Sequence, residues 1–200
     1  MVGNQHRVVL ASNNKGKLRE FNQLLEPSGL SVVPQGDFGP IEVDETGLTF
    51  VENAILKARA ASEHAGLPAL ADDSGIEVDA LNGAPGIYSA RYAGVGASDQ
   101  VNLDKLLDAL REVPESQRGA RFRCVIVYLR HPADPTPLIF VGTWEGRILT
   151  AARGENGFGY DPVFYVPTHD CSSAELPPEE KNRVSHRGQA LAALLKALTA

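Results

Sequence analysis

The sequence predicts an α/β protein built around a mixed β-sheet. Short apolar runs typical of buried strands alternate along the chain with segments whose apolar residues recur at helical spacing. Near the middle of the chain, two long apolar runs follow each other across a short turn, a pattern typical of a hairpin. Because strands and helices are interleaved, we expect one sheet with parallel and antiparallel neighbours, covered by helices.

The composition limits the size of the fold and the class of its partners. The 200 residues are 43% hydrophobic and 22% charged, as in ordinary globular proteins, so we expect one domain or two closely packed lobes. The net charge of −6 argues against general binding to nucleic-acid backbones, which needs a basic surface. A small phosphorylated ligand is still compatible with this charge, because a few lysines and a metal ion can neutralise phosphates locally.

Cysteine usage and the N-terminal segment both favour a cytoplasmic location. Cys124 and Cys171 form no CxxC pair and no disulfide framework, so we expect reduced thiols. The segment 1–7 has no apolar run that would serve as a signal peptide, and no segment approaches the length of a membrane span.

The first part of the chain predicts two strands and two helices. In order, we expect a strand at 7–11, a helix at 18–25, a strand at 30–33, a loop at 35–46 and a helix from 50 to about 61. Pro27 and Gly29 end the first helix. Thr49 and Glu52 have capping-box spacing at the start of the second helix, which explains Glu52 better than a role as a metal ligand.

The remainder of the chain predicts further strands, a helix and a closing helix. We expect a strand at 67–75 that continues by alternation to 81, a turn at 82–86 and a helix at 101–110. Two strands follow at 121–129 and 138–149, joined by a turn at 131–135. The last part of the chain predicts a glycine-rich turn at 154–159, a polar stretch from 177 and a helix at 189–198.

Asp72 and Asp73 are the most informative pair of residues in the chain. They follow a short apolar run and precede a Ser-Gly turn. Because side chains alternate along a strand, the two carboxylates point to opposite faces, and only one can enter a given site. An acidic pair at a strand end suits a hard cation such as Mg²⁺, although a turn with solvated carboxylates is an alternative interpretation.

The strand, loop and helix at 8–25 resemble a phosphate cradle. Loop amides and a helix N-terminus attract anions, and Lys17 lies in the first turn of the predicted helix. The loop is not a Walker A motif, which requires Gly at the position of Ala11 and Ser or Thr at that of Leu18. The alternative is an ordinary helix start with solvated lysines.

Two further charged residues are candidates for the same site. Glu45 lies in a loop and would give, together with Asp73, two carboxylates to one cation. Lys57 lies on the second predicted helix. The alternatives are a solvated turn for Glu45 and a solvent-facing side chain for Lys57, as for most lysines.

Two later motifs have the chemistry of base recognition. Phe158 and Tyr160, next to glycines and Asp161, are able to stack on a base and accept from its ring N–H groups. His186 and Arg187 form a donor-rich pair before the last predicted helix. Taken alone, the first motif is equally typical of a surface turn anchored by one aromatic ring, and the second of any helix start.

Taken together, these segments resemble the inosine triphosphate pyrophosphatase family, which includes the bacterial dITP/XTP pyrophosphatases. The matching segments are 10–17, 45–50 with 52–54, 71–75, 83–92, 157–162 and 185–188. Each motif alone is weak, but six in this order are specific, and they span nearly the whole chain. Ser12-Asn13 stands where many members have Thr-Gly, and the serine hydroxyl can replace that of threonine.

The resemblance implies an elongated, two-lobed α/β fold of one domain over residues 1–200, with a central mixed sheet flanked by helices and a substrate cleft between the lobes. It also implies a homodimer, dependence on Mg²⁺, and hydrolysis of deaminated purine triphosphates (ITP, dITP and XTP) to the monophosphate and pyrophosphate.

The resemblance also implies roles for individual residues. Asp73 would accept a proton from water, and Glu45 with Asp73 would hold Mg²⁺. Lys17 and Lys57 would bind phosphates, and the loop 12–17 would wrap the triphosphate. The substrate-binding residues implied are Ser12, Asn13, Asn14, Lys15, Gly16, Lys17, Lys57, Ser74, Phe158, Gly159, Tyr160, Asp161, Lys181, His186 and Arg187.

Base selection then has a physical explanation. Hypoxanthine and xanthine carry an oxygen at position 6, where adenine carries an amino donor. Donors from His186 and Arg187 would satisfy that oxygen and would face the adenine amino group donor to donor, which rejects the analogue by roughly 10⁴-fold or more. Phe158 would stack on the base, Asp161 would accept from its N1–H, and Lys181 would lie near the base or its carbonyl group.

Other functions are weighed against this one. A septum-associated nucleotide pyrophosphatase acting on dTTP and UTP would show no preference for a 6-oxo purine, and the motifs at 158–161 and 186–187 argue against it. A regulatory module that senses nucleotides would need no carboxylate positioned for water, so the Asp72-Asp73 pair argues against it. A scaffold is disfavoured by polar motifs concentrated in loops.

Overall fold

The computed structural model of the protein describes residues 6–199. The first five residues of the segment on which the signal-peptide argument rests therefore lie outside the described residues. None of the helices within 6–199 combines the length and the apolar character that crossing a bilayer would require.

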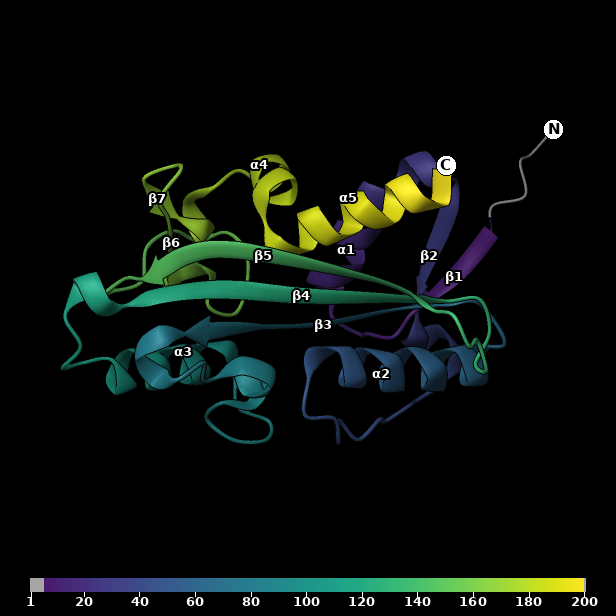
Figure 1. The fold of residues 1–200 in the computed structure, drawn as a ribbon, viewed down its shortest axis with the longest axis horizontal. Helices are drawn as coiled ribbons and strands as arrows, with labels where there is room; N and C mark the ends of the chain where they lie inside the picture. The colour runs from purple at the N-terminus through teal and green to yellow at the C-terminus, as the bar shows by residue number, and fades with distance from the viewer. Residues whose placement is uncertain (1–5, 200) are drawn as a thin grey trace. The chain divides into compact units, whose positions relative to one another are not determined.

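Seven strands of the described chain form one mixed sheet in the order β2-β1-β3-β4-β5-β6-β7 (Figure 1). β1 is parallel to β2 and β3, whereas β6 is antiparallel to β5 and β7, so the prediction of a mixed sheet is confirmed. The strands are β1 (His6–Leu10), β2 (Leu30–Pro34), β3 (Ala69–Val78), β4 (Gly119–Leu129), β5 (Leu138–Ile148), β6 (Phe164–Val166) and β7 (Cys171–Ser172).

The α-helices within 6–199 are α1 (Lys15–Leu25), α2 (Phe50–Ala65), α3 (Asp99–Ala109), α4 (Pro178–Val184) and α5 (His186–Thr199). The sequence predicts α4 only as a polar stretch, because two prolines, Pro177 and Pro178, stand at its start. Pro178 is the first helical residue, where the missing N–H costs nothing. α5 begins at His186 rather than near residue 189, so His186 and Arg187 belong to its first turn.

The chain divides into two compact units. The first contains the described residues up to Asp73, residues 124–142 and the chain from Arg187 onward, and the second contains 74–123 and 143–186. Asp73 and Arg187 are thus boundary residues of the first unit. The single domain and the substrate cleft expected from the sequence stay predictions.

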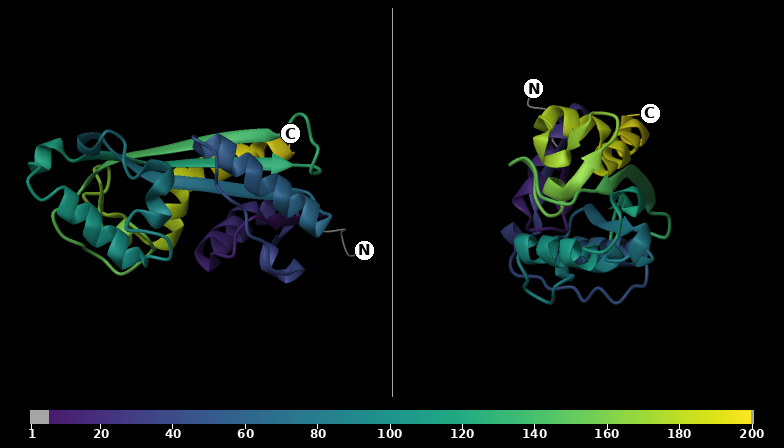
Figure 2. Two further views of the ribbon diagram at one scale, coloured as in Figure 1. Left: turned by 90° about the horizontal axis from the view of Figure 1, so that it is seen from below. Right: turned by 90° about the vertical axis from the view of Figure 1, so that its left-hand side faces the viewer.

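In the first unit, the side chains of β1 alternate between two helical layers. Val8 and Leu10 pack with residues of α1 and α5, whereas Val9 and Ala11 pack with the alanines of α2. Figures 1 and 2 show α5 and α2 on opposite sides of the strands. This is the period of two that a strand covered on both faces requires.

The same alternation runs along β3 and decides the environment of the acidic pair. Leu70 belongs to the α1/α5 layer, whereas Ala69 and Ala71 belong to the α2 layer. Asp72 lies two residues after Leu70 and therefore faces α1 and α5. Asp73 lies two residues after Ala71 and therefore faces α2.

In the second unit, α3 packs on the sheet by one apolar face. Leu103, Leu106 and Leu110 are buried together with Ile76 and Val78 of β3. The core continues into aromatic residues of β4, β5 and β6, which support the turn at 154–161 and the His186 ring described below.

Candidate active site

On the α2 side of β3, two carboxylates meet one ammonium group. Lys57 Nζ on α2 donates to Asp73 Oδ1 at 2.5 Å and to Glu45 Oε1 at 3.1 Å. It also donates to the backbone oxygen of Asp72 at 3.2 Å. The side chain of Lys57 is 15% exposed and that of Asp73 is 9% exposed. The structure thus brings together three residues that the sequence assigns to one site.

Burial and neighbouring charges act in opposite directions on the carboxyl group of Asp73. Burial raises the pKa of Asp73, although the Lys57 charge partly offsets the effect. Burial disfavours the charge of Lys57, but Asp73 and then Glu45 outweigh it and raise the Lys57 pKa. Asp73 Oδ2 is buried and has no hydrogen-bond partner among the described residues. A buried carboxylate oxygen without a partner is costly, and such strain is typical of functional sites.

Asp72 lies in the opposite electrostatic environment, on the α1/α5 side. Its Oδ1 accepts from Lys17 Nζ at 2.5 Å, and its Oδ2 accepts from Arg187 Nε at 2.7 Å and from Cys124 Sγ at 3.3 Å. Burial disfavours ionisation of this carboxyl group, but Arg187 and then Lys17 hold its pKa well below the usual range. The two cations therefore favour the ionised form of the buried Asp72 carboxyl group.

The loop before α1 forms a structured helix start. Asn14 Oδ1 accepts from the backbone N–H of Lys17 at 3.0 Å and caps the helix. The Ser12 hydroxyl accepts from the backbone N–H of Asn14 at 3.1 Å. Asn13, Asn14 and Lys15 are exposed, whereas Lys17 is half-buried because it reaches Asp72.

The motif at 157–161 is organised in the second unit by the buried carboxylate of Asp161. Its Oδ2 accepts from the backbone N–H of Phe158 at 2.8 Å and from Lys181 Nζ at 2.6 Å, and its Oδ1 accepts from Ser173 Oγ at 2.9 Å. Lys181 Nζ also lies 5.0 Å from the centre of the Phe158 ring. Asp161 thus joins Phe158 and Lys181 into one cluster.

The neighbouring positions of this motif are tied to other elements. The backbone N–H of Gly159 donates to Asp99 Oδ2 at 2.9 Å. Tyr160 is buried, its hydroxyl donates to the Ser89 carbonyl at 2.7 Å, and burial raises its pKa. Ser74 is half-buried in β3. Tyr160 therefore anchors the turn, while Phe158 is left partly accessible.

The His-Arg pair at the start of α5 points to two different environments. The His186 ring stacks on Phe122, with centroids 4.7 Å apart and planes 10° apart, and is nearly buried in the second unit. Arg187 binds Asp72 in the first unit and also donates from Nη1 to Glu20 Oε2 at 2.8 Å. No motif in the sequence indicates a role for Glu20, although it lies one helical turn after Lys17.

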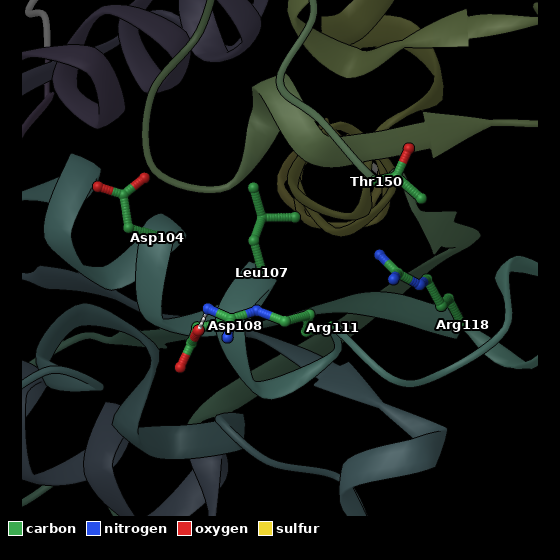
Figure 3. Close-up of a pocket in the computed structure, with 6 residues that line it drawn as sticks. All are labelled: Asp104, Leu107, Asp108, Arg111, Arg118 and Thr150. Carbon is green, nitrogen blue, oxygen red and sulfur yellow. Dashed lines mark hydrogen bonds and ion pairs between the residues drawn. The ribbon is translucent and has the colours of Figure 1, made fainter.

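A pocket of about 450 Å³ in the second unit contains none of the residues predicted for the site (Figure 3). It is lined by Asp104, Leu107, Asp108, Arg111, Arg118 and Thr150. The buried guanidinium of Arg118 donates to three backbone carbonyls, of Leu110, Val113 and Leu149. The residue therefore closes the end of α3, where carbonyls lack helical partners.

The predicted capping role of Glu52 agrees with the contacts of α2. Thr49 Oγ1 accepts from the Glu52 N–H, and Glu52 Oε2 accepts from the Leu48 N–H and the Thr49 hydroxyl. Within residues 6–199, no group of three or more His, Cys, Asp or Glu side chains is arranged for a metal ion. Glu45 and Asp73 are two carboxylates that already meet at one cation, so they fit a metal that takes its other ligands from substrate and water.

Comparisons with known proteins show the family of the chain. Residues 8–197 match the model of the Ham1 family. A dITP/XTP pyrophosphatase of Vibrio parahaemolyticus is 60% identical over 97% of both chains, and one of Thioalkalivibrio sulfidiphilus is 62% identical over 96% of this chain and 98% of its own. A HAM1 protein from Coxiella burnetii superposes with a TM-score of 0.90 at 52% identity, covering 97% of this chain and 98% of its own. The chain belongs to the Ham1 family.

Proposed function

We propose that this protein hydrolyses deaminated purine triphosphates (ITP, dITP and XTP) to the nucleoside monophosphate and pyrophosphate. In this reaction the oxygen of water bonds to the α-phosphorus, the bond to the bridging oxygen breaks, and pyrophosphate leaves. The observation that carries the proposal is the buried Asp73 carboxylate, which lies beside Lys57 and Glu45 with one oxygen lacking a partner among the described residues. The names of the relatives support the same activity.

Asp73 is the proposed proton acceptor. A general base works best when its pKa approaches the working pH, and burial raises the pKa of Asp73 in that direction. Asp72 is unsuited to this task because its charge is fixed by Arg187 and Lys17. Because their environments are opposite, Asp73 is proposed to act in catalysis and Asp72 to act in structure.

The lysines and the capped loop are the proposed phosphate ligands. Lys17 and Lys57 supply compact positive charges, which suit the non-reacting oxygens of a triphosphate. The loop 12–17 adds hydroxyl, amide and backbone donors at the N-terminus of α1, where the helix dipole favours anions.

We propose Mg²⁺ as the cofactor, held by Glu45 and Asp73. A hard cation takes oxygen ligands and is usually bound through one or two carboxylates plus substrate phosphates, as this pair would allow. The unpartnered Asp73 oxygen is an acceptor that such a cation would satisfy. When bound, the ion would neutralise charge on the triphosphate and on the leaving pyrophosphate.

The proposed base-binding residues belong to the second unit, except Arg187, which belongs to the first. Phe158 would stack on the purine, Asp161 and Lys181 would contact it from the same cluster, and His186 would donate to the 6-oxo group. The sequence-based hypothesis gives the same donor role to Arg187, whose guanidinium binds Asp72 and Glu20 in this structure.

We also propose, from the family resemblance, a homodimer acting in the cytoplasm, where its nucleotide substrates are found. Sedimentation equilibrium at micromolar concentration would give twice the mass of the chain. A species with the mass of one chain at all concentrations would contradict the dimer.

The deciding experiment measures pyrophosphate release from ITP, XTP, dTTP, ATP and GTP, each with Mg²⁺ and with EDTA. The proposal predicts fast, Mg²⁺-dependent release from ITP and XTP but not from ATP or GTP. Equal rates on all five nucleotides would support a hydrolase but contradict the proposed selection of the base. Saturable binding of ITP without any release would point to a sensing module and contradict the enzyme.

A further inference from the structure

We propose that Glu20 is a positioning residue of the phosphate-binding site, which acts through Arg187 and Asp72 to fix the ammonium group of Lys17. The proposal rests on the proposed function in one respect, the role of Lys17 as a phosphate ligand. Otherwise it rests on contacts within the first unit.

Three ion pairs link the four side chains into a network in which positive and negative charges alternate. Glu20 Oε2 binds Arg187 Nη1 at 2.8 Å, and Arg187 Nε binds Asp72 Oδ2 at 2.7 Å. Asp72 Oδ1 then binds Lys17 Nζ at 2.5 Å. Lys17 and Glu20 are three residues apart on α1, so the two ends of this network lie on the same face of that helix.

Arg187 gives Asp72 a second counter-ion besides Lys17. Asp72 is fully buried between two cations, so Arg187 can balance its charge while Lys17 keeps a bond to its other oxygen. Without Arg187, Lys17 would be the counter-ion of Asp72 and would offer less positive potential to a substrate. The positive potential that Lys17 offers to a substrate therefore depends on the order of the charges as well as on the individual ion pairs.

Glu20 determines how Arg187 is held. The guanidinium is only 3% exposed, and a buried cation needs its partners in place. Glu20 binds one terminal nitrogen and thereby directs Nε toward Asp72. A carboxylate repels a triphosphate, so Glu20 would contribute to phosphate binding only indirectly, through this orientation.

The test compares Glu20→Gln with Glu26→Gln in the full chain. Both substitutions remove one negative charge, Glu20 in the middle of α1 and Glu26 at its C-cap, but Glu26 is exposed and outside this network. For Glu20→Gln we expect the KM for ITP and the Kd for inorganic tripolyphosphate each to rise about three- to tenfold, with kcat changed less. Glu20→Asp, which keeps the charge, should recover part of the affinity.

The same substitution made in the Lys17→Met variant distinguishes a positioning role of Glu20 from general destabilisation of the fold. If Glu20 acts through Lys17, Glu20→Gln should not weaken tripolyphosphate binding further once Lys17→Met is present. Additive losses in the double variant, or a lower melting temperature with unchanged tripolyphosphate affinity, would overturn the inference. A wild-type protein that neither binds nor hydrolyses ITP would instead refute the proposed function, which distinguishes the two failures.

Discussion

At the scale of single residues, the pleat of β3 gives two chemically identical side chains different properties. Asp72 continues the face of Leu70 and meets Lys17 and Arg187, whereas Asp73 continues the face of Ala71 and meets Lys57. One carboxylate has its pKa depressed and the other has it raised. Position along the strand, rather than residue type, decides which one is suited to accept a proton.

We expect Asp73→Asn to lower kcat for ITP by about 100-fold or more, because the amide cannot accept the proton of the attacking water. Nucleotide binding should persist, since Asn has the same shape and Lys17 and Lys57 remain. Pyrophosphate release and calorimetric binding measure the two quantities. A near-normal rate would show that Asp73 is not the base.

We expect His186→Phe to narrow the preference for ITP over ATP. Phenylalanine keeps a ring that can stack on Phe122 but has no nitrogen to donate to the 6-oxo group. The measurement is kcat/KM for both nucleotides. Losses of the same factor on ITP and ATP would indicate that His186 has a packing role.

At the scale of elements, the turn at 154–161 contains two glycines, Gly154 and Gly157, at which a Cβ would collide with neighbouring atoms. Gly157 has a φ of +81°, and a Cβ there would collide with the carboxylate of Asp161. Gly159 also has positive φ (+62°), but a Cβ there would meet nothing within 4 Å.

We therefore expect Gly157→Ala to destabilise the protein more than Gly159→Ala. Both substitutions carry a backbone cost of about 1–2 kcal/mol, but only the first displaces Asp161. Urea unfolding measures the stability, and the KM for ITP should rise in Gly157→Ala because Phe158 and Lys181 lose their common partner. Equal unfolding free energies for the two variants would contradict a collision between a Cβ at residue 157 and the Asp161 carboxylate.

The turn between β4 and β5 depends on one buried carboxylate. Asp134 accepts from the Arg130 side chain at 2.8 and 2.6 Å and from the backbone N–H groups of Arg130 and Thr136. The Arg130 side chain is the main cause that holds the pKa of Asp134 below its usual range.

A depressed pKa contributes stability above the unfolded value, near 3.9, and loses it as the pH falls toward the folded value. We expect Asp134→Asn to lower the melting temperature by a few degrees at pH 7 and by progressively less below pH 4. Thermal scans of both proteins from pH 7 to pH 2 measure this difference. If the difference in melting temperature between the two proteins stays constant down to pH 2, the charged hydrogen bonds of Asp134 are not its cause.

At the scale of the whole molecule, we expect the proposed metal ion to be required for turnover and not for folding. Glu45 and Asp73 share the Lys57 ammonium, so their charges have a partner without a metal ion. We expect EDTA to abolish pyrophosphate release while the melting temperature stays unchanged. A marked fall in melting temperature on chelation would contradict this expectation.

The sequence predicts most of the fold because its signals are local. The apolar runs, the Thr49-Glu52 cap and the alternation at Asp72-Asp73 are all visible in short windows. α4 is missed because Pro177 and Pro178 are typical of loops as well as of helix starts. The start of α5 is placed too late because polar residues hide its first turn.

The partners of the site residues are less predictable than the residues themselves. Alternation shows that Asp72 and Asp73 differ, but the choice of helix for each depends on how β3 lies between two layers. The bond between Glu20 and Arg187 joins residues 167 positions apart, and nothing local to either residue indicates it. The proposed functions of the site residues stay predictions for the experiments above.

The alternation of β3 also constrains how this chain can change during evolution. Deleting a single residue between Leu70 and Asp72 would leave an apolar strand that still pairs with β1. It would nevertheless exchange the two carboxylates between the helical layers, since every later side chain would switch faces. We therefore expect insertions and deletions in this segment to be selected against more strongly than many substitutions, because one missing residue would disable both carboxylates at once.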